Sequence, residues 1–341
     1  MRICFFANLS QHANWREMFE KVEFYRVDIE LLRSLGHEVV LAGTPRGIDW
    51  SADLYYGWWW GHAPFLLPPA KLRRRPLIVT GAFDYATCRE ELPGLCYLDR
   101  PAWQRTILSS MLRLADANLF ISQYEFNEVT DNLKVRNPVS VPLAIDTDLC
   151  IVDDAASPGD YYFTVSLQSR ENAVRKGLPQ AIEAFARVAR QRPETRLIIA
   201  GKRGDYTATL AAQAEALGVG DRVEFPGMIS TEDKLRAFRE CIAYVQPTLY
   251  EGFGHAVGEA LACGADVVAA SRGAVPEVTG GLAQIVDPKD VDAIADAMLA
   301  CAANRADGAT RHARHNWIVS NFGMNVRRER LRRVISDVTG R

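Results

Sequence analysis

Short apolar runs alternate with longer amphipathic stretches along the first half of the chain. Short apolar runs favour buried strands, whereas apolar positions spaced three and four residues apart favour helices. Strands are therefore expected at Ile3–Ala7, Glu38–Ala42, Leu54–Tyr56, Leu77–Thr80 and Asn118–Ile121. Helices are expected at Met18–Leu35, Trp103–Ala115 and Tyr124–Asn132.

The polar segment Asp153–Asp160 interrupts this alternation, which then starts again. Strands are expected at Tyr162–Ser166, Leu197–Ala200, Val223–Phe225, Ala243–Gln246 and Asp266–Ala270, and helices at Ala208–Leu217, Thr231–Cys241 and Ala256–Ala262. Strands that alternate with helices predict parallel sheets, so the expected fold class is α/β. We place one domain at residues 1–155 and a second at residues 156–324.

The composition excludes several classes of protein. The 341 residues are 48% apolar and 24% charged, and the formal net charge of -2 argues against a protein that coats nucleic acid. The seven scattered cysteines form no C-x-x-C pair, which favours a reducing cytoplasm over a disulfide framework. The longest uncharged stretch, Leu54–Ala70, contains three prolines and two glycines and is a poor membrane span. A cytoplasmic protein is expected.

The stretch Gln246–Gly280 contains a glycine-rich turn between an expected strand and an expected helix. Gly252 and Gly254 in this turn let a ligand approach the backbone, and free N–H groups at the helix start form an anion site suited to a diphosphate. Glu251 precedes the turn, and Glu259 lies in the helix among apolar residues, where two ribose hydroxyls would satisfy its oxygens. Either glutamate alone is more simply a solvated acid; together with the glycines they favour a ligand site.

This motif resembles glycosyltransferase family 4 through Glu251-x7-Glu259 with Gly-Phe-Gly between them, followed by Gly264, Ser271, Gly273 and Pro276-Glu277-Val278. Members are retaining enzymes with the GT-B fold, in which two Rossmann-like domains with parallel sheets face each other across a cleft. The resemblance implies that Glu259 binds the nucleotide ribose and that Glu251 contacts the donor sugar. It also implies a last helix, at about residues 325–341, that packs back on the first domain. The remaining donor-binding residues are expected to be Gly252, Phe253, Gly254, His255, Ala256 and Val257.

A second match to this family lies upstream, where Arg170 and Lys176 follow the expected first strand of the second domain. Two cations at one strand end neutralise a departing diphosphate without a metal, so we expect catalytic roles for both beside Glu251, and neither metal nor cofactor. Alternatively, Arg170 and Lys176 only cap a helix or face solvent. The segment Phe225-Pro226-Gly227-Met228 resembles the family loop that meets the nucleotide base mainly through its backbone. Met228 is therefore expected to bind the donor, and UDP, GDP and dTDP donors are not distinguished.

The acceptor side departs from the family. The loop after the first strand contains His12 and no glycine, and Asp84 lies near the position where many members carry a histidine. The Trp58-Trp59-Trp60 cluster cannot enter one core if its strand continues, so at least one ring is expected at a cleft, in solvent or against another molecule. His62 follows this cluster, and Asp84, His62 and His12 are the acceptor-side candidates.

Two basic runs, Lys71–Arg75 and Arg327–Arg333, are most simply solvated surfaces. Because the first run lies close to the tryptophan cluster in the sequence, we also consider peripheral contact with an anionic membrane at the inner face.

The sequence thus predicts a retaining hexosyltransferase that uses a nucleoside diphosphate sugar as donor. The acceptor is expected to be a hydroxyl of a glycan or a lipid-linked glycan in bacterial-type surface glycan assembly. The alternatives are a GT-B sugar-nucleotide epimerase or hydrolase, and an inactive module that still binds the nucleotide sugar. A nicotinamide dehydrogenase is disfavoured because no G-x-G-x-x-G follows the first strand.

Overall fold

A computed structural model describes residues 1–86, 89 and 92–340. The chain forms two compact units. Unit 1 contains residues 1–86, 94–144 and 324–340, and unit 2 contains Ile145–Gly323. Unit 2 therefore begins upstream of the segment Asp153–Asp160, at which the sequence pattern separates the domains.

Unit 1 is built on a six-stranded parallel sheet with the strand order β2-β1-β3-β4-β5-β6. The strands are β1 (Arg2–Phe6), β2 (Glu38–Ala42), β3 (Leu54–Trp58), β4 (Leu77–Gly81), β5 (Ala117–Phe120) and β6 (Pro138–Ser140). The helices are α1 (Trp15–Lys21), α2 (Glu23–Ser34), α3 (Leu67–Leu72), α4 (Ala102–Leu114), α5 (Gln123–Asn132) and α14 (Met324–Thr339). Short 3₁₀ helices lie at Pro45–Gly47, Ala63–Leu66 and Tyr97–Asp99.

The single helix expected at Met18–Leu35 is wrong, because the chain bends between α1 and α2. Val22 has φ -87° and ψ 109°, which is extended backbone. The bend brings aromatic rings on both sides of it together: the centroids of Phe19 and Tyr25 lie 5.6 Å apart, and that of Phe19 lies 5.7 Å from Phe5 of β1. Packing of both rings against one face of the sheet thus accompanies the break.

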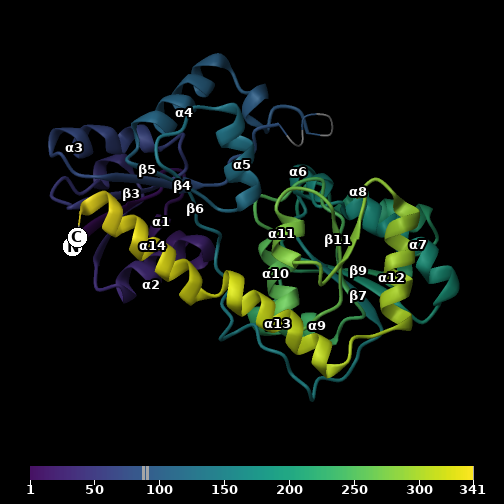
Figure 1. Cartoon of the computed structure of the whole chain (residues 1–341). Coiled ribbons are helices and arrows are strands. Elements are labelled where there is room, and N and C mark those ends of the chain that lie inside the picture. Colours follow the sequence, from purple (N-terminus) through teal and green to yellow (C-terminus); the bar gives the residue numbers. More distant parts are fainter. Residues whose placement is uncertain (87–88, 90–91, 341) are drawn as a thin grey trace. The chain divides into compact units, whose positions relative to one another are not determined.

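Unit 2 repeats the architecture of a sheet flanked by helices (Figure 1). Its strand order is β12-β11-β10-β7-β8-β9, again all parallel. Its strands are β7 (Tyr161–Val165), β8 (Arg196–Ala200), β9 (Val223–Gly227), β10 (Tyr244–Gln246), β11 (Val267–Ala270) and β12 (Gln284–Val286). Its helices are α6 (Arg170–Arg175), α7 (Leu178–Gln191), α8 (Thr207–Ala216), α9 (Thr231–Glu240), α10 (His255–Ala262), α11 (Val275–Thr279), α12 (Val291–Ala303) and α13 (Gly308–Phe322), with a 3₁₀ helix at Gly220–Arg222. The expected α/β class with parallel sheets is confirmed.

The apolar stripe of α7 lies in the main core of unit 2. Leu178, Ile182, Phe185 and Val188 are fully buried against the sheet and α12. Helices α9 and α13 both contact α10. In an open parallel sheet, ligands bind outside the carboxyl ends of the strands, and the loops after β7, β8, β9 and β10 all lie at that edge.

Two further expectations concern the cysteines and the membrane. Cys4, Cys96, Cys150, Cys241, Cys263 and Cys301 are buried and free of disulfides, and Cys88 lies outside the described residues. Among the helices that the structure describes, none combines the length and the apolar character needed to cross a bilayer.

Candidate active site

The glycine-rich turn connects β10 to α10 in unit 2. Gly254 adopts φ +90° and ψ 49° immediately before α10, a left-handed conformation that glycine reaches without a steric penalty. No side chain within the described part of the chain caps this helix start, so the first N–H groups of α10 are not satisfied by a capping side chain. The turn therefore offers backbone donors where the sequence predicts a diphosphate site.

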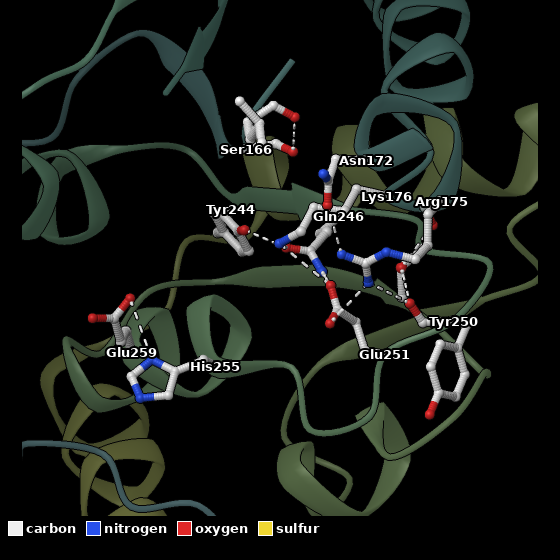
Figure 2. Close-up of polar contacts among 12 residues, drawn as sticks. Ser166, Asn172, Arg175, Lys176, Tyr244, Gln246, Tyr250, Glu251, His255 and Glu259 are labelled. Carbon is white, nitrogen blue, oxygen red and sulfur yellow. Dashed lines mark hydrogen bonds and ion pairs between the residues drawn. The ribbon is translucent and has the colours of Figure 1, made fainter. Parts of the chain in front are cut away.

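Glu251 lies before this turn, at the centre of a largely buried polar cluster (Figure 2). Its carboxylate oxygens lie 3.2 Å from Nη1 of Arg175 and 3.3 Å from Nζ of Lys176, and Nε2 of Gln246 donates to it at 3.0 Å. The oxygen of the Gln246 amide in turn accepts a hydrogen bond of 2.5 Å from the Tyr244 hydroxyl. Four side chains from β10 and the end of α6 thus fix the orientation of this carboxylate.

The cations decide the charge of Glu251. Only 12% of its side chain is exposed. Burial raises the pKa of Glu251, but the positive charges of Arg175 and Lys176 lower it by more, so its pKa lies below the ordinary value. Glu251 is therefore an anion at neutral pH, able to accept hydrogen bonds from hydroxyl groups.

Backbone contacts hold the Glu251 segment in place. The N–H of Ala274 donates to the Glu251 carbonyl at 2.9 Å, and Nη1 of Arg175 donates to the Tyr250 carbonyl at 2.9 Å. A Cβ on Gly273, which has φ +59°, would lie 2.3 Å from the Glu251 carbonyl oxygen. Gly273, one of the residues that carry the family resemblance, is thus required by a close approach of two backbone segments.

Glu259 lies on α10 with only 7% of its side chain exposed. Lys234 of α9 donates to one of its oxygens at 2.6 Å, and Nδ1 of His255 lies 3.9 Å from the other. Burial raises the pKa of Glu259, and the hydrogen bond and charge of His255 together with Lys234 lower it to about 2. Glu259 is therefore a second carboxylate held as an anion, and it lies on α10, the helix that begins at the turn.

The expected cations occupy different surroundings. Lys176 contacts Glu251 directly, with 17% of its side chain exposed. Arg170 is exposed at the first position of α6, where its backbone N–H donates to Asp205 at 3.0 Å, and no carboxylate of the described residues pairs with its guanidinium. Met228, expected near the base, has 75% of its surface exposed.

Four residues of the polar clusters were not anticipated: Arg175, Tyr244, Gln246 and Lys234. Arg175 precedes Lys176, and a second cation beside the expected one was an available signal. Lys234 has no such signal, because it reaches Glu259 only through the packing of α9 on α10.

Two of the three acceptor-side candidates line one pocket of unit 1. The pocket has a volume of about 260 Å³ and lies at the carboxyl ends of β3 and β4. It is lined by Trp59, Trp60, Gly61, His62, Ala82, Phe83, Asp84, Tyr97, Arg100 and Leu108. His62 and Asp84 are therefore neighbours of one hollow, whereas His12 is an exposed residue of the loop after β1 and does not line it.

The tryptophan cluster divides at the end of β3. Trp58 and Trp60 are 1% and 2% exposed, whereas Trp59 is partly exposed and has φ +74°. The strand stops at Trp58, so the alternation of side chains does not continue, and Trp59 and Trp60 both line the pocket. The basic run Lys71–Arg75 precedes β4 and thus lies at the opposite end of these parallel strands. The two features are separated in space, contrary to their proximity in sequence.

The second basic run is not a uniformly solvated surface. Arg327 is 1% exposed, and its Nε and Nη2 donate to Asp28 at 2.6 and 2.9 Å. Its Nη1 donates to the carbonyls of Val141 and Pro142 at 2.6 and 2.8 Å. The interpretation of Arg327 as a surface cation is therefore wrong, because this residue joins α14 to the interior of unit 1.

Comparison with known proteins agrees with this arrangement. Residues 153–318 match the family of glycosyl transferases group 1. O-antigen chain mannosyltransferase B of Escherichia coli is 28% identical over 265 residues, which cover 73% of this chain and 66% of that protein. The GDP-mannose-dependent alpha-(1-6)-phosphatidylinositol monomannoside mannosyltransferase of Mycolicibacterium smegmatis is 30% identical over 251 residues, which cover 68% of this chain and 65% of that protein. The matches thus span slightly less than two thirds of each relative.

The fold has solved counterparts as well. Sucrose-phosphate synthase of Thermosynechococcus elongatus superimposes with a TM-score of 0.78 and 16% identity, over 100% of this chain and 99% of that one. The parallel six-stranded sheets of both units are those of the GT-B fold. Residues 153–318, which carry both glutamates and their cations, thus match the family of glycosyl transferases group 1, in a chain with the GT-B fold.

Proposed function

We propose that this protein is a retaining glycosyltransferase that moves a mannose unit from a nucleoside diphosphate sugar to a hydroxyl of a glycan or lipid-linked acceptor. The observation that carries this proposal is the Glu251 cluster beside the turn of a group 1 domain. The mannosyltransferase names of two relatives support the sugar, and their O-antigen and glycolipid acceptors support a role in surface glycan assembly.

In the proposed donor complex, the diphosphate lies against the first N–H groups of α10. Arg170 and Lys176 supply positive charge to the leaving diphosphate, and Glu259 accepts hydrogen bonds from the ribose hydroxyls. Glu251 accepts hydrogen bonds from the hydroxyls of the sugar. Its orientation is already fixed by Gln246 and the cations, so little reorganisation accompanies donor binding.

The transfer itself needs the acceptor on the same side of the sugar as the diphosphate. The bond between the anomeric carbon and the diphosphate oxygen breaks, the acceptor oxygen bonds to that carbon, and a diphosphate oxygen takes the acceptor proton. This geometry retains the anomeric configuration. Arg170 and Lys176 provide the positive charge that a metal ion supplies in metal-dependent enzymes, so the reaction is proposed to proceed without a metal.

The pocket of unit 1 is the proposed acceptor site. Trp59 offers an aromatic face and Asp84 a carboxylate, a combination suited to a sugar ring with its hydroxyls. The pKa of His62 is lowered by burial, which favours its neutral form and lets a ring nitrogen accept a hydroxyl proton in a hydrogen bond.

Peripheral contact with the inner face of the membrane is proposed on the opposite edge of this sheet. A hollow of about 490 Å³ there is lined by Lys71, Arg74, Arg75 and Arg136, alongside Asp116 and Asp337. Leu72, with 76% of its surface exposed, lies within the same basic run. Cations around an exposed apolar side chain are typical of segments that contact anionic lipid surfaces.

The test is calorimetric titration with GDP, UDP and dTDP, with and without a chelator, on the wild type, Glu251→Ala and Glu259→Ala. We expect chelator-independent binding, weakened in Glu259→Ala and largely preserved in Glu251→Ala. Transfer from GDP-mannose to mannoside acceptors is expected to be lost in Glu251→Ala, and proton NMR of the wild-type product is expected to show the α-anomer. Glu232→Gln, which changes an exposed acid of α9, is the control. Full turnover by both alanine variants would contradict the site assignment.

A further inference from the structure

The loops after β8 and β9 are joined at the carboxyl edge of the unit 2 sheet. The N–H of Gly201 donates to the carbonyl of Gly227 at 2.8 Å, and Arg203 forms an isolated parallel bridge with Gln168. A Cβ on Gly201 would lie 2.0 Å from the Ser166 carbonyl oxygen, so the loop after β8 also packs closely on the loop after β7. The backbone of Arg203 is therefore fixed beside the loop after β9.

The Arg203 side chain is exposed at this junction. Its Nη2 donates to the Phe225 carbonyl, and its Nε lies 3.9 Å from the position that a Cβ on Gly227 would take. No carboxylate of the described residues lies within ion-pair distance of this guanidinium. A guanidinium has five N–H donors, so one bond to a carbonyl orients the group and leaves a pair of parallel donors for a ligand.

The position of Arg203 is suited to a nucleotide base. Lys234 lies 2.6 Å from Glu259, the proposed ribose ligand, and the first residue of α9 is three residues before Lys234, about 4.5 Å along the helix axis. The exposed Met228 and the buried Gly227 lie three and four residues before the start of that helix. Lys234 thus connects Glu259 to α9, and the segment before α9 contacts Arg203 through Gly227. Arg203 therefore lies on the side of the proposed ribose site where the loop after β9 leads into α9.

We propose that Arg203 selects guanine as the base of the donor. Guanine presents two adjacent acceptors, O6 and N7, which match the two parallel N–H donors of an arginine. Adenine replaces O6 with a donor amino group, and uracil has no second acceptor beside O4, so neither offers this pair. The exposed thioether of Met228 is placed to cover a face of the base. This inference rests on the proposed function, in which unit 2 binds a nucleoside diphosphate.

The experiment is calorimetric titration of the full chain with GDP, UDP, ADP, IDP and 7-deaza-GDP. IDP keeps O6 and N7 and lacks only the 2-amino group, whereas 7-deaza-GDP lacks N7. We expect GDP and IDP to bind with similar affinity. UDP, ADP and 7-deaza-GDP are expected to bind about 10- to 100-fold more weakly, the range of one bidentate base contact.

Three variants locate the effect. Arg203→Met is expected to bind GDP and UDP equally. Arg203→Lys keeps the charge without the planar pair of donors and is also expected to lose the preference for GDP. Lys202→Met removes the neighbouring exposed cation with the same change in net charge and is expected to keep the preference. Circular dichroism of each variant checks that the fold is intact.

The outcomes separate this inference from the proposed function. If Arg203→Met binds nucleotides with the same ratio of GDP to UDP affinity as the wild type, the role of Arg203 is overturned. The proposed donor site is unaffected by that result. Equal affinity of the wild type for GDP and UDP would overturn the role of Arg203 in the same way. Failure of every nucleotide to bind the wild type would overturn both.

Discussion

Glu259 is a buried carboxylate and Glu251 a largely buried one, and different neighbours keep the two ionised. Glu251 faces Arg175 and Lys176, whereas Glu259 faces His255 of its own helix, α10, and Lys234 of the preceding helix, α9. Removing a buried charge from water is costly unless partners compensate, so each glutamate is specified together with its cation. This coupling gives the residues a measurable signature in the pH dependence of stability.

The first prediction concerns Glu259. Its folded pKa of about 2 lies below the ordinary value of 4.5, so its contribution to stability is complete above the unfolded pKa and is lost as the pH falls through the folded one. We expect the free energy of unfolding of the wild type to fall from about pH 5 towards pH 2, and to fall less steeply in Glu259→Gln. Urea unfolding followed by circular dichroism across this pH range measures the free energy of unfolding of both proteins. Parallel pH profiles for the two proteins would contradict the prediction, and Glu232→Gln controls for loss of an exposed acid.

At this scale the sequence reveals what is local. The two glutamates and the glycines of the turn lie within one short segment, so their spacing alone placed them together. Lys234 could not be predicted, because it contacts Glu259 through the packing of α9 on α10 and not through proximity in sequence. The resemblance implies Arg170 and Lys176 as cations for the diphosphate, whereas the two cations that contact Glu251 are Arg175, at the end of α6, and Lys176.

At the scale of elements, tightly packed glycines join the loops that carry the site. Gly177 precedes α7 with φ +68°, and a Cβ there would lie 2.0 Å from the carbonyl oxygen of Pro247, which follows β10. The helices and strands were mostly predictable from their apolar periods. The bend at Val22 was not, because the apolar pattern continues through it and only tertiary packing of the flanking rings marks it.

The second prediction compares two left-handed glycines. Gly218 has φ +73°, and apart from its own chain neighbours no heavy atom of the described residues lies within 4 Å of the position that a Cβ would take there. Gly218→Ala therefore tests backbone strain alone, about 1–2 kcal/mol. Gly177→Ala adds displacement of the Pro247 carbonyl and is expected to reduce the free energy of unfolding by clearly more. It is also expected to lower transfer activity, since Pro247 lies one residue after Gln246. Urea unfolding and mannosyl transfer of both variants measure the difference, and equal destabilisation by the two would count against it.

At the scale of the whole molecule, the basic hollow of unit 1 predicts lipid binding. Arg74 has φ +51°, a conformation that favours glycine, so Arg74→Gly removes a cation from the hollow while relieving backbone strain. We expect wild-type protein to sediment with phosphatidylglycerol vesicles and not with phosphatidylcholine vesicles, and Arg74→Gly to sediment less. Arg33→Gln, an exposed cation of α2 outside the hollow, is the control. Wild-type protein that stays entirely in the supernatant would exclude this surface as a membrane contact.

Unit 1 depends on the far end of the chain through one buried ion pair. Arg327 of α14 binds Asp28 of α2 through two nitrogens, and the Tyr56 hydroxyl of β3 donates to Asp28 at 2.8 Å. The positive charge of Arg327 thus satisfies a carboxylate almost three hundred residues away, together with two backbone carbonyls. A composition-based view of the run Arg327–Arg333 cannot distinguish this residue from its neighbours, because only its place on the helix directs it inward.

The final prediction concerns the stability of the Asp28–Arg327 ion pair. Removing one partner of a buried ion pair costs more stability than replacing both partners with apolar residues. Arg327→Met leaves the buried Asp28 carboxylate with the Tyr56 hydrogen bond but without its countercharge, which is expected to cost about 3–5 kcal/mol of unfolding free energy. The double variant Asp28→Leu/Arg327→Met removes both charges and is expected to recover much of that loss, because two apolar side chains of similar length leave no uncompensated charge. Arg328→Met, one position along and exposed, is expected to change stability by less than about 0.5 kcal/mol. Urea unfolding of the full chain, with hydrogen exchange in α14, compares all three. If Arg327→Met matched Arg328→Met in stability and in α14 protection, the C-terminal helix would be held by its apolar contacts, and the buried pair would contribute nothing to its docking.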